Sequence, residues 1–177
     1  MRKTGRRNGR SDTNLSPEDK RRRVFQRAVK LLAAKPRSTA ELRERLLATR
    51  GSSNTTVEEV VTRLSEYGYL DDERFAFSYA SLTIKQRPVG RKKLERDLML
   101  KKVERKTADE ALDIVFQETP EEQLIDRAIE KRIRSRGRPQ TREDAKKLFD
   151  HLLRQGFGFE LVSEKVRAAA RLEIDES

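Results

Sequence analysis

One apolar pattern recurs three times along the chain and constrains its fold more than any other feature. It reads L-x-x-x-L-[LM] and begins at Leu42, Leu94 and Leu148, so the copies are offset by 52 and 54 residues. Apolar residues at this spacing lie on one face of an α-helix. Repeats of about 50 residues are typical of small helical units that stack in arrays. The pattern therefore predicts an all-α chain built from tandem copies of one unit.

Each copy of the pattern lies between two other amphipathic segments. A longer segment precedes it, at 25–32, 75–82 and 125–129, and another follows it, at 60–64, 111–115 and 161–166. Three helices per copy give about nine helices in all. We expect an elongated array of three tandem three-helix repeats with a short segment at each end. The predicted ranges are a disordered basic arm over 1–15, repeats over 16–70, 71–118 and 119–172, and an acidic tail over 173–177.

Residues that favour helix starts support this division. Ser16 followed by Pro17 offers an N-cap and a proline at the first helical position. Capping-box spacing, with Ser or Thr three residues before Glu, recurs along the chain. It occurs at Ser38, Thr55, Thr107 and Thr119, with a weaker version at Thr141.

The stretch GYLDDERFA, residues 68–76, places two adjacent carboxylates in a basic chain. Asp71 suits an N-cap and Asp72 the first helical turn, where the positive end of the helix dipole favours anions. Gly68 suits a left-handed position after the preceding helix. A catalytic carboxylate pair would need a cleft and a partner base, and no nearby residue offers either. We interpret the stretch as a junction between repeats, with an acidic patch for a basic partner as the alternative.

The positive charge of the chain is concentrated at its start. Residues 1–37 carry 13 Lys and Arg against 3 Asp and Glu, whereas the remaining residues carry 28 against 27. Such an arm is typical of a polycation that binds phosphates. A solubilising tail without a specific partner is the alternative.

Composition argues against several classes of protein. The absence of Cys excludes disulfides and thiolate metal sites and fits a reducing cytoplasm. No apolar run approaches the ~18 residues of a membrane span, and the basic N-terminus lacks the apolar segment of a secretory signal. The single histidine, His151, lies among leucines, and no phosphate-binding glycine motif occurs. We expect a cytoplasmic monomer with no enzymatic activity, cofactor, metal or membrane contact.

The junction and the segment after it resemble the central signature of the RecX family, whose members regulate the RecA recombinase. The resemblance lies in GYLDDERFAFSYA at 68–80 and QRPVGRKKLERDLMLKKV at 86–103. One position departs, because the family often has Gly where this chain has Lys102 before Val103. The residues that match are Tyr69, Leu70, Asp71, Asp72, Arg74, Phe75, Ala76, Tyr79, Arg87, Gly90, Leu94 and Leu98.

This resemblance covers roughly residues 23–170 and implies both a fold and a function. The implied fold is an elongated, modular, all-α protein of tandem three-helix units. The implied partner is the RecA filament on DNA, bound in its groove. Binding there would block filament growth or promote disassembly, and so inhibit strand exchange, ATP hydrolysis and coprotease function in DNA repair and the SOS response.

Two clusters of basic residues occupy equivalent places in the second and third repeats. Residues 85–106 carry ten Lys and Arg against three acidic residues, and residues 127–147 carry nine against three. Each cluster spans the turn before the second helix of its repeat, where cations disfavour the helix that starts there. This unfavourable placement of cations occurs in both repeats and indicates an external anion, most simply phosphate. A solvated face with i,i+4 ion pairs is the alternative. The candidate contact residues are Arg87, Arg91, Lys92, Lys93, Arg96, Arg132, Arg134, Arg136, Arg138 and Arg142.

Within these clusters Arg87 and either Arg136 or Arg138 are the leading candidates, because a guanidinium can bind phosphate or carboxylate through two hydrogen bonds. Neither cluster has interleaved aromatic residues, so we expect contact with the DNA backbone without sequence preference. Two other functions stay open. A stand-alone sequence-specific DNA-binding regulator would need a helix aimed at base edges, and a helical scaffold would need no nucleic acid.

Overall fold

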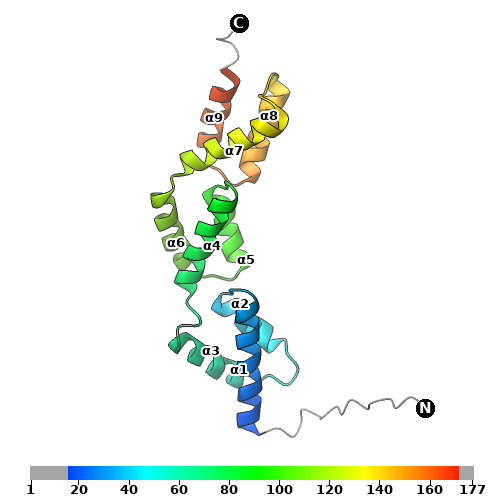
Figure 1. Ribbon diagram of the computed structural model, residues 1–177, viewed down its shortest axis with the longest axis vertical. Helices are drawn as coiled ribbons and strands as arrows, with labels where there is room; N and C mark the ends of the chain where they lie inside the picture. The colour runs from blue at the N-terminus through cyan, green and yellow to red at the C-terminus, as the bar shows by residue number, and fades with distance from the viewer. Residues whose placement is uncertain (1–15, 172–177) are drawn as a thin grey trace, which may run out of the picture. The chain divides into compact units, whose positions relative to one another are not determined.

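The structure is a computed structural model that describes residues 16–171 (Figure 1). These residues form nine α-helices and no strand, which confirms the predicted all-α fold. The predicted basic arm over 1–15 and acidic tail over 173–177 lie outside the described residues. In chain order the helices are α1 (Pro17–Ala34), α2 (Thr39–Leu47), α3 (Asn54–Glu66), α4 (Asp72–Gln86), α5 (Arg91–Leu100), α6 (Arg105–Glu118), α7 (Glu121–Arg136), α8 (Arg142–Arg154) and α9 (Phe159–Arg171).

The helices group into two compact units, one that ends at Leu70 and one that begins at Asp71. In the first unit α1, α2 and α3 pack on one another around a core that includes Leu42 and Leu64. In the second unit one continuous core extends from Ala76 on α4 to Val166 on α9. The predicted division of residues 71–172 into two repeats stays a prediction about domains.

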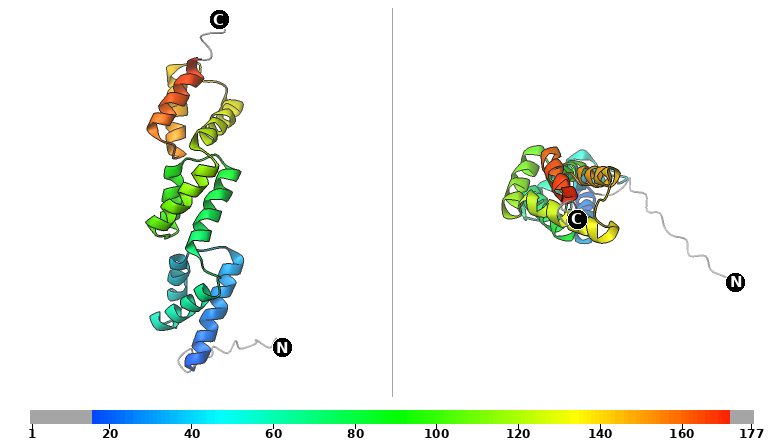
Figure 2. Two further views of the ribbon diagram at one scale, coloured as in Figure 1. Left: turned by 90° about the vertical axis from the view of Figure 1, so that its left-hand side faces the viewer. Right: turned by 90° about the horizontal axis from the view of Figure 1, so that it is seen from above.

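The helices of the second unit form two groups of three, α4–α6 and α7–α9, which we call triplets, as we call α1–α3 of the first unit. Each helix packs mainly on neighbours from its own triplet. α4 and α5 both pack on α6, while α7 packs on α8 and α9. α8 and α9 lie side by side, as the orange and red helices of Figure 2 show. The two triplets meet through the residues that share the continuous core, among them Val89 and Phe157 from the connecting segments, which are 0% and 1% exposed.

The repeated L-x-x-x-L-[LM] pattern supplies an equivalent pair of core residues in each triplet. Its two leucines are buried in all three copies, at Leu42 and Leu46, Leu94 and Leu98, and Leu148 and Leu152. Its third position is more exposed: the exposed fraction is 37% at Leu47 and 64% at Met99. The helical period explains this difference, because residues i and i+4 share a face while residue i+5 is turned away from it.

The predicted helix starts are partly confirmed. The side chains of Ser16, Ser38, Asp71 and Thr141 accept hydrogen bonds from the first-turn amides of α1, α2, α4 and α8. The predicted caps Thr55, Thr107 and Thr119 are wrong, because α3, α6 and α7 take Ser53, Glu104 and Pro120 as their N-caps. For α3 the reason is local: the Ser53 hydroxyl accepts from the Thr56 amide at 3.2 Å, so the helix starts before Thr55.

Lys102 occupies a left-handed position of the kind that glycine takes at other helix ends of this chain. Its φ is 61°, and Gly68 and Gly156 take 71° and 89° at the ends of α3 and α8. After α5, the Val103 amide donates to the Leu98 carbonyl at 3.1 Å, as the Tyr69 amide donates to Leu64 after α3. The turn is therefore kept in spite of the lysine, in a conformation that disfavours residues with a Cβ.

Two glycines allow a backbone-to-backbone contact between the two triplets of the second unit. The Gly90 amide donates to the Gln155 carbonyl at 2.9 Å, and the Lys92 amide donates to the Gly156 carbonyl at 3.2 Å. A Cβ at Gly90 would run into the Gly156 carbonyl group and the Phe157 amide nitrogen. The start of α5 is thereby fixed against the α8–α9 turn.

Candidate anion-binding interface

The residues of the family signature form the start of α4 and its contacts. The Asp71 carboxylate accepts from the Arg74 amide at 2.8 Å, which confirms the predicted N-cap, and Asp72 lies in the first turn. Ala76 is fully buried in the second core, while Leu70 is buried in the first. Tyr69 is 64% exposed. Except for Tyr69, these signature residues therefore start α4 or pack in one of the two cores, as expected for a junction between repeats.

Tyr79 links α4 to α5 and to Arg87. The ring of Tyr79 stacks on Phe75 with 6.2 Å between centroids, and its hydroxyl donates to Asp97 at 3.4 Å. Burial, followed by the charge of Asp97, raises the pKa of the Tyr79 hydroxyl. Asp97 also pairs with the Arg87 guanidinium at 3.8 Å. Arg87 is half-exposed, so its guanidinium is oriented by Asp97 while it still faces solvent.

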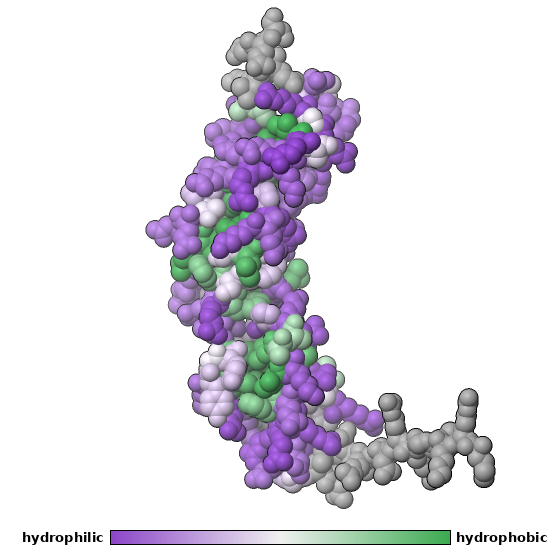
Figure 3. Space-filling model, in the orientation of Figure 1, coloured by the Kyte–Doolittle hydropathy of each residue, from purple (hydrophilic) through white to green (hydrophobic). Residues whose placement is uncertain are grey.

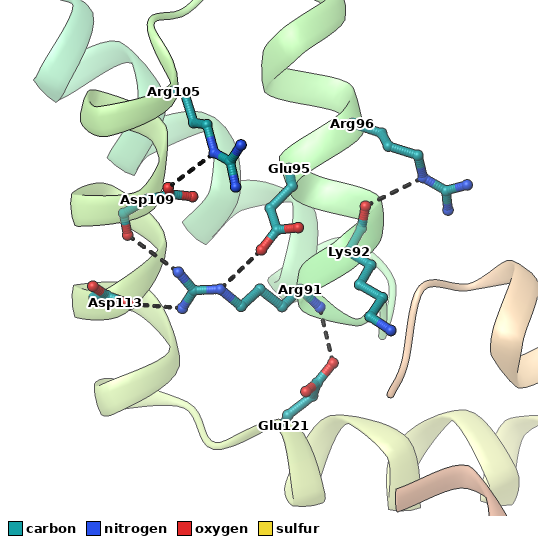
Figure 4. A network of polar contacts seen from close by, with 8 residues as sticks. All are labelled: Arg91, Lys92, Glu95, Arg96, Arg105, Asp109, Asp113 and Glu121. Atoms are coloured by element: carbon teal, nitrogen blue, oxygen red, sulfur yellow. Dashed lines mark hydrogen bonds and ion pairs between the residues drawn. The ribbon is translucent and has the colours of Figure 1, made fainter. Parts of the chain in front are cut away.

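Arg91 is engaged inside the protein (Figure 4). Its guanidinium donates to Glu95 at 3.0 Å, to Asp113 at 2.7 Å and to the Asp109 carbonyl at 3.4 Å. Burial lowers the pKa of Arg91, but the hydrogen bonds to Asp113 and Glu95 outweigh it, so the pKa is raised. Arg91 therefore connects α5 to α6. We do not include it among the residues that we propose for contact with an external anion.

The first turn of α5 is capped by residues that are distant in sequence. Gly90 offers no side chain at the N-cap. The Arg91 amide instead donates to the Glu121 carboxylate on α7 at 2.9 Å. Burial raises the pKa of Glu121, against the opposing effect of the Arg91 amide. The amides that could otherwise bind an anion at this helix start are thus satisfied from within the protein.

The other cations of the first cluster differ in their surroundings. Lys92 and Arg96 are exposed on α5, and the Arg96 guanidinium donates to the Lys92 carbonyl at 3.2 Å. Lys93 is half-buried, beside the Gly156 turn. Arg87, Lys92 and Arg96 therefore remain available at the surface of the second unit.

The second cluster surrounds a hollow of about 410 Å³ between the end of α7 and the start of α8. Gly137 takes a φ of 80° and ends α7, so that the chain turns back around the hollow. The Asp144 side chain belongs to the α8 cap and accepts from the Thr141 hydroxyl at 2.9 Å. Four cations line the hollow against this single carboxylate: Arg132, Arg136, Arg138 and Lys147.

The arginines of the second cluster lack carboxylate partners. Lys147 pairs with Glu143 at 2.9 Å. Within residues 16–171, by contrast, no ion pair forms at Arg132, Arg134, Arg136, Arg138 or Arg142. The structure brings Arg132, Arg136 and Arg138 together around the hollow, whereas Arg134 and Arg142 do not line it. A concave, cationic surface with uncompensated guanidinium groups suits an anion with several oxygens.

His151 lies on α8 near Arg132 and Arg154, and its pKa is lowered. Burial lowers the pKa of the imidazole, and the charges of Arg132 and Arg154 lower it further. His151 is half-buried on α8.

Sequence reasoning did not anticipate two contributors to this arrangement. Glu121 caps α5 from 30 positions away, and Asp97 orients Arg87 from the next helix. The periodic pattern places Asp97 near the buried face of α5, a signal of a structural carboxylate. No local signal identifies Glu121, because its role depends on a tertiary contact.

Two family models match the chain, described as the first and second three-helix domains of RecX. They match residues 25–64 and 71–112. The regulatory protein RecX of Treponema pallidum is 40% identical over 110 residues, which cover 62% of this chain and 66% of that protein. That of Chlorobium limicola is 32% identical over 140 residues, which cover 78% of this chain and 84% of that protein.

The chain belongs to the RecX family. It spans about half to two thirds of the length of several relatives, since its match covers 54% of the Bacillus subtilis protein at 30% identity. The crystal structure of RecX from Lactobacillus salivarius shares the fold with a TM-score of 0.74 at 19% identity, over 88% of this chain and 99% of that chain. A second RecX crystal structure gives 0.71 at 21% identity.

The RecX signature and the cationic hollow lie in different parts of the chain. The signature residues from Asp71 onward fall in the range matched by the second three-helix domain. The hollow, formed by α7 and α8, lies beyond both matched ranges. Among the described residues, no helix is both long and apolar enough for a membrane span. Nor do three or more potential metal-ligating side chains gather anywhere in residues 16–171.

Proposed function

We propose that this RecX-family protein binds the RecA filament on DNA in the cytoplasm and inhibits recombinase, ATPase and coprotease activity in DNA repair and the SOS response. Family membership supports a regulatory function. The observation that carries the proposal is the group of uncompensated arginines around the α7–α8 hollow. A nucleoprotein filament is a polyanion, and such cations would bind its phosphates or carboxylates.

The geometry favours contact with the DNA backbone over readout of bases. Arg132 and Arg136 from α7 and Arg138 from the turn after it line one hollow, and they do not form a single recognition helix that could enter a groove. No aromatic side chain lines the hollow, so it lacks a platform for base stacking. Contact of this kind would be indifferent to sequence and would weaken as salt rises.

The proposal is tested by adding the protein to RecA on single-stranded DNA and measuring ATP hydrolysis. The wild-type protein should lower hydrolysis at substoichiometric amounts. The double variant Arg136→Gln/Arg138→Gln should need about 10 to 30 times more protein, since each lost charge-assisted contact costs about 1 kcal/mol.

A matched control removes two cations that are already compensated. Arg105 pairs with Asp109 at 3.7 Å and Lys106 with Glu110 at 3.8 Å, both on α6. Arg105→Gln/Lys106→Gln carries the same change in charge and should inhibit as the wild type does. If the wild-type protein leaves hydrolysis unchanged and binds one duplex sequence tightly, the function is that of a stand-alone DNA-binding regulator. If both double variants lose the same amount of inhibition, the arginines of the hollow do not carry the effect on ATP hydrolysis.

A further inference from the structure

α1 in the first unit separates an apolar side from a cationic side. Val24 and Ala28 are buried in the core of that unit. Arg23, Arg27 and Lys30 are exposed and follow one another at spacings of four and three residues. This spacing places all three on one face of the helix. The surface over the start of α1 is hydrophilic in Figure 3.

Two other cations of α1 have carboxylate partners, and Arg27 and Lys30 differ from them in this respect. Arg21 pairs with Glu59 at 3.4 Å, and Arg22 pairs with Asp19 at 3.9 Å. Neither Arg27 nor Lys30 forms an ion pair with any residue of the range 16–171. Like charges three and four residues apart destabilise a helix. Arg27 and Lys30 thus keep an unfavourable arrangement that an external anion would relieve.

The same residues line a hollow of about 250 Å³ on the surface of the first unit. The lining consists of Arg23, Gln26, Arg27, Lys30 and Leu31, without a carboxylate. The cations lie along about 10 Å of helix at 1.5 Å per residue. That length corresponds to about three phosphates along one strand of B-form DNA at 3.4 Å each.

We propose that this face of α1 is a second binding site of the protein, and that its ligand is the phosphodiester backbone of nucleic acid. The guanidinium of Arg27 would bind one phosphate through two hydrogen bonds, and the ammonium of Lys30 would bind a neighbouring phosphate as a point charge. Gln26 lines the same hollow and adds a neutral donor. The site extends the proposed function to a second DNA contact on the other unit and does not require the recombinase.

The composition of the hollow favours nucleic acid over other polyanions. Protein interfaces are centred on buried aromatic or aliphatic side chains, and here Leu31 is the one apolar residue of the lining. Nucleic-acid interfaces are more polar and more positively charged. A helix that lies on a membrane inserts its apolar side, but Val24 and Ala28 on that side of α1 are already buried in the core.

The test measures binding of the full chain to a fluorescein-labelled DNA duplex of about 20 base pairs, by anisotropy, at salt concentrations from about 50 to 200 mM. Each phosphate contact contributes about 0.9 to the slope of log affinity against log salt. The variant Arg27→Gln/Lys30→Gln should lose about 1.8 from that slope. Across this range the affinity of the wild type should therefore fall about 12-fold more than that of the variant.

Two further variants keep the result specific to this face. Arg21→Gln/Arg22→Gln removes the same charge from compensated positions of α1 and should change the slope by less than about 0.5. Arg27→Lys keeps the charge and should retain the wild-type slope. Circular dichroism should show equal helix content in all variants, since all the changed side chains are exposed.

The proposal is overturned if Arg27→Gln/Lys30→Gln keeps the wild-type slope, or if Arg21→Gln/Arg22→Gln loses as much. It is also overturned if polyglutamate of equal charge binds as tightly as the duplex and depends on Arg27 and Lys30, because the site would then suit an acidic protein. No recombinase is present, so these outcomes are independent of the effect on RecA and of the α7–α8 hollow.

Discussion

Substitution of Gly90 by alanine should open the contact between the two triplets of the second unit. The new Cβ would collide with backbone atoms of Gly156 and Phe157, which cannot move aside as a flexible side chain can. The start of α5 and the α8–α9 turn must therefore separate. Separation breaks the hydrogen bonds of Gly90 to Gln155 and of Lys92 to Gly156, at 2.9 and 3.2 Å.

The magnitude follows from these losses. Each backbone hydrogen bond contributes about 1 kcal/mol net to stability. Forcing an extra methyl group into a packed interior costs about 1–3 kcal/mol. Together these terms lower the free energy of unfolding of the second unit by about 3–5 kcal/mol. With a urea dependence of about 1.5 kcal/mol per M, the midpoint should fall by about 2–3 M.

Urea unfolding followed by circular dichroism measures this shift, and hydrogen exchange locates it. Amides of residues 91–100 should exchange faster in Gly90→Ala, because the first turn of α5 loses its partners. Amides of α1, α2 and α3 should be unaffected, since they belong to the other unit.

Gly158→Ala is the matched control. It adds the same methyl group two residues after Gly156, where a Cβ would meet no atom within 4 Å. The control should unfold within about 0.5 M of the wild type, since substitutions that meet no neighbouring atom change stability by about 0.5 kcal/mol. If Gly90→Ala has the same midpoint as this control, the two triplets are not joined through these glycines.

Three further results are expected from urea midpoints. Burial raises the pKa of Glu121 above its usual 4.5, so the protonated carboxyl stabilises the folded state at low pH. This stability is lost as the pH rises through the raised pKa, and the midpoint of Glu121→Gln should therefore increase relative to that of the wild type as the pH rises past 4.5. Lys102→Gly should stabilise by about 1 kcal/mol because φ is 61°, whereas Lys101→Gly should destabilise. Arg91→Gln should cost about 1–2 kcal/mol through its lost carboxylate partners, while Arg134→Gln should leave the midpoint unchanged.

Local patterns in the sequence predict the helices of this protein well. The spacing of leucines identifies the buried pair in each triplet, from Leu42 and Leu46 to Leu148 and Leu152. Asp71 and Thr141 start their helices as their residue types predict. These features depend on contacts between residues three to five positions apart, which periodicity and capping rules describe.

The clusters of cations were visible in the sequence, but their availability was not. Arg91 and Arg136 have the same residue type and similar neighbours in sequence. Arg91 is engaged because Asp113, 22 positions away, lies opposite it on α6. Arg136 stays without such a partner because the chain turns at Gly137 and forms a hollow. The difference depends on which carboxylates the fold brings within reach.

The sequence by itself determined a chain of amphipathic helices, four of their N-caps and the position of its charge, because each of these depends on neighbours along one or two helical turns. The tertiary structure alone decided that Glu121 caps α5, that Gly90 meets Gly156, and which arginines keep their charge for an external anion. Those outcomes depend on groups 20 to 70 positions apart. Local propensity has no information about such pairs until the helices have packed.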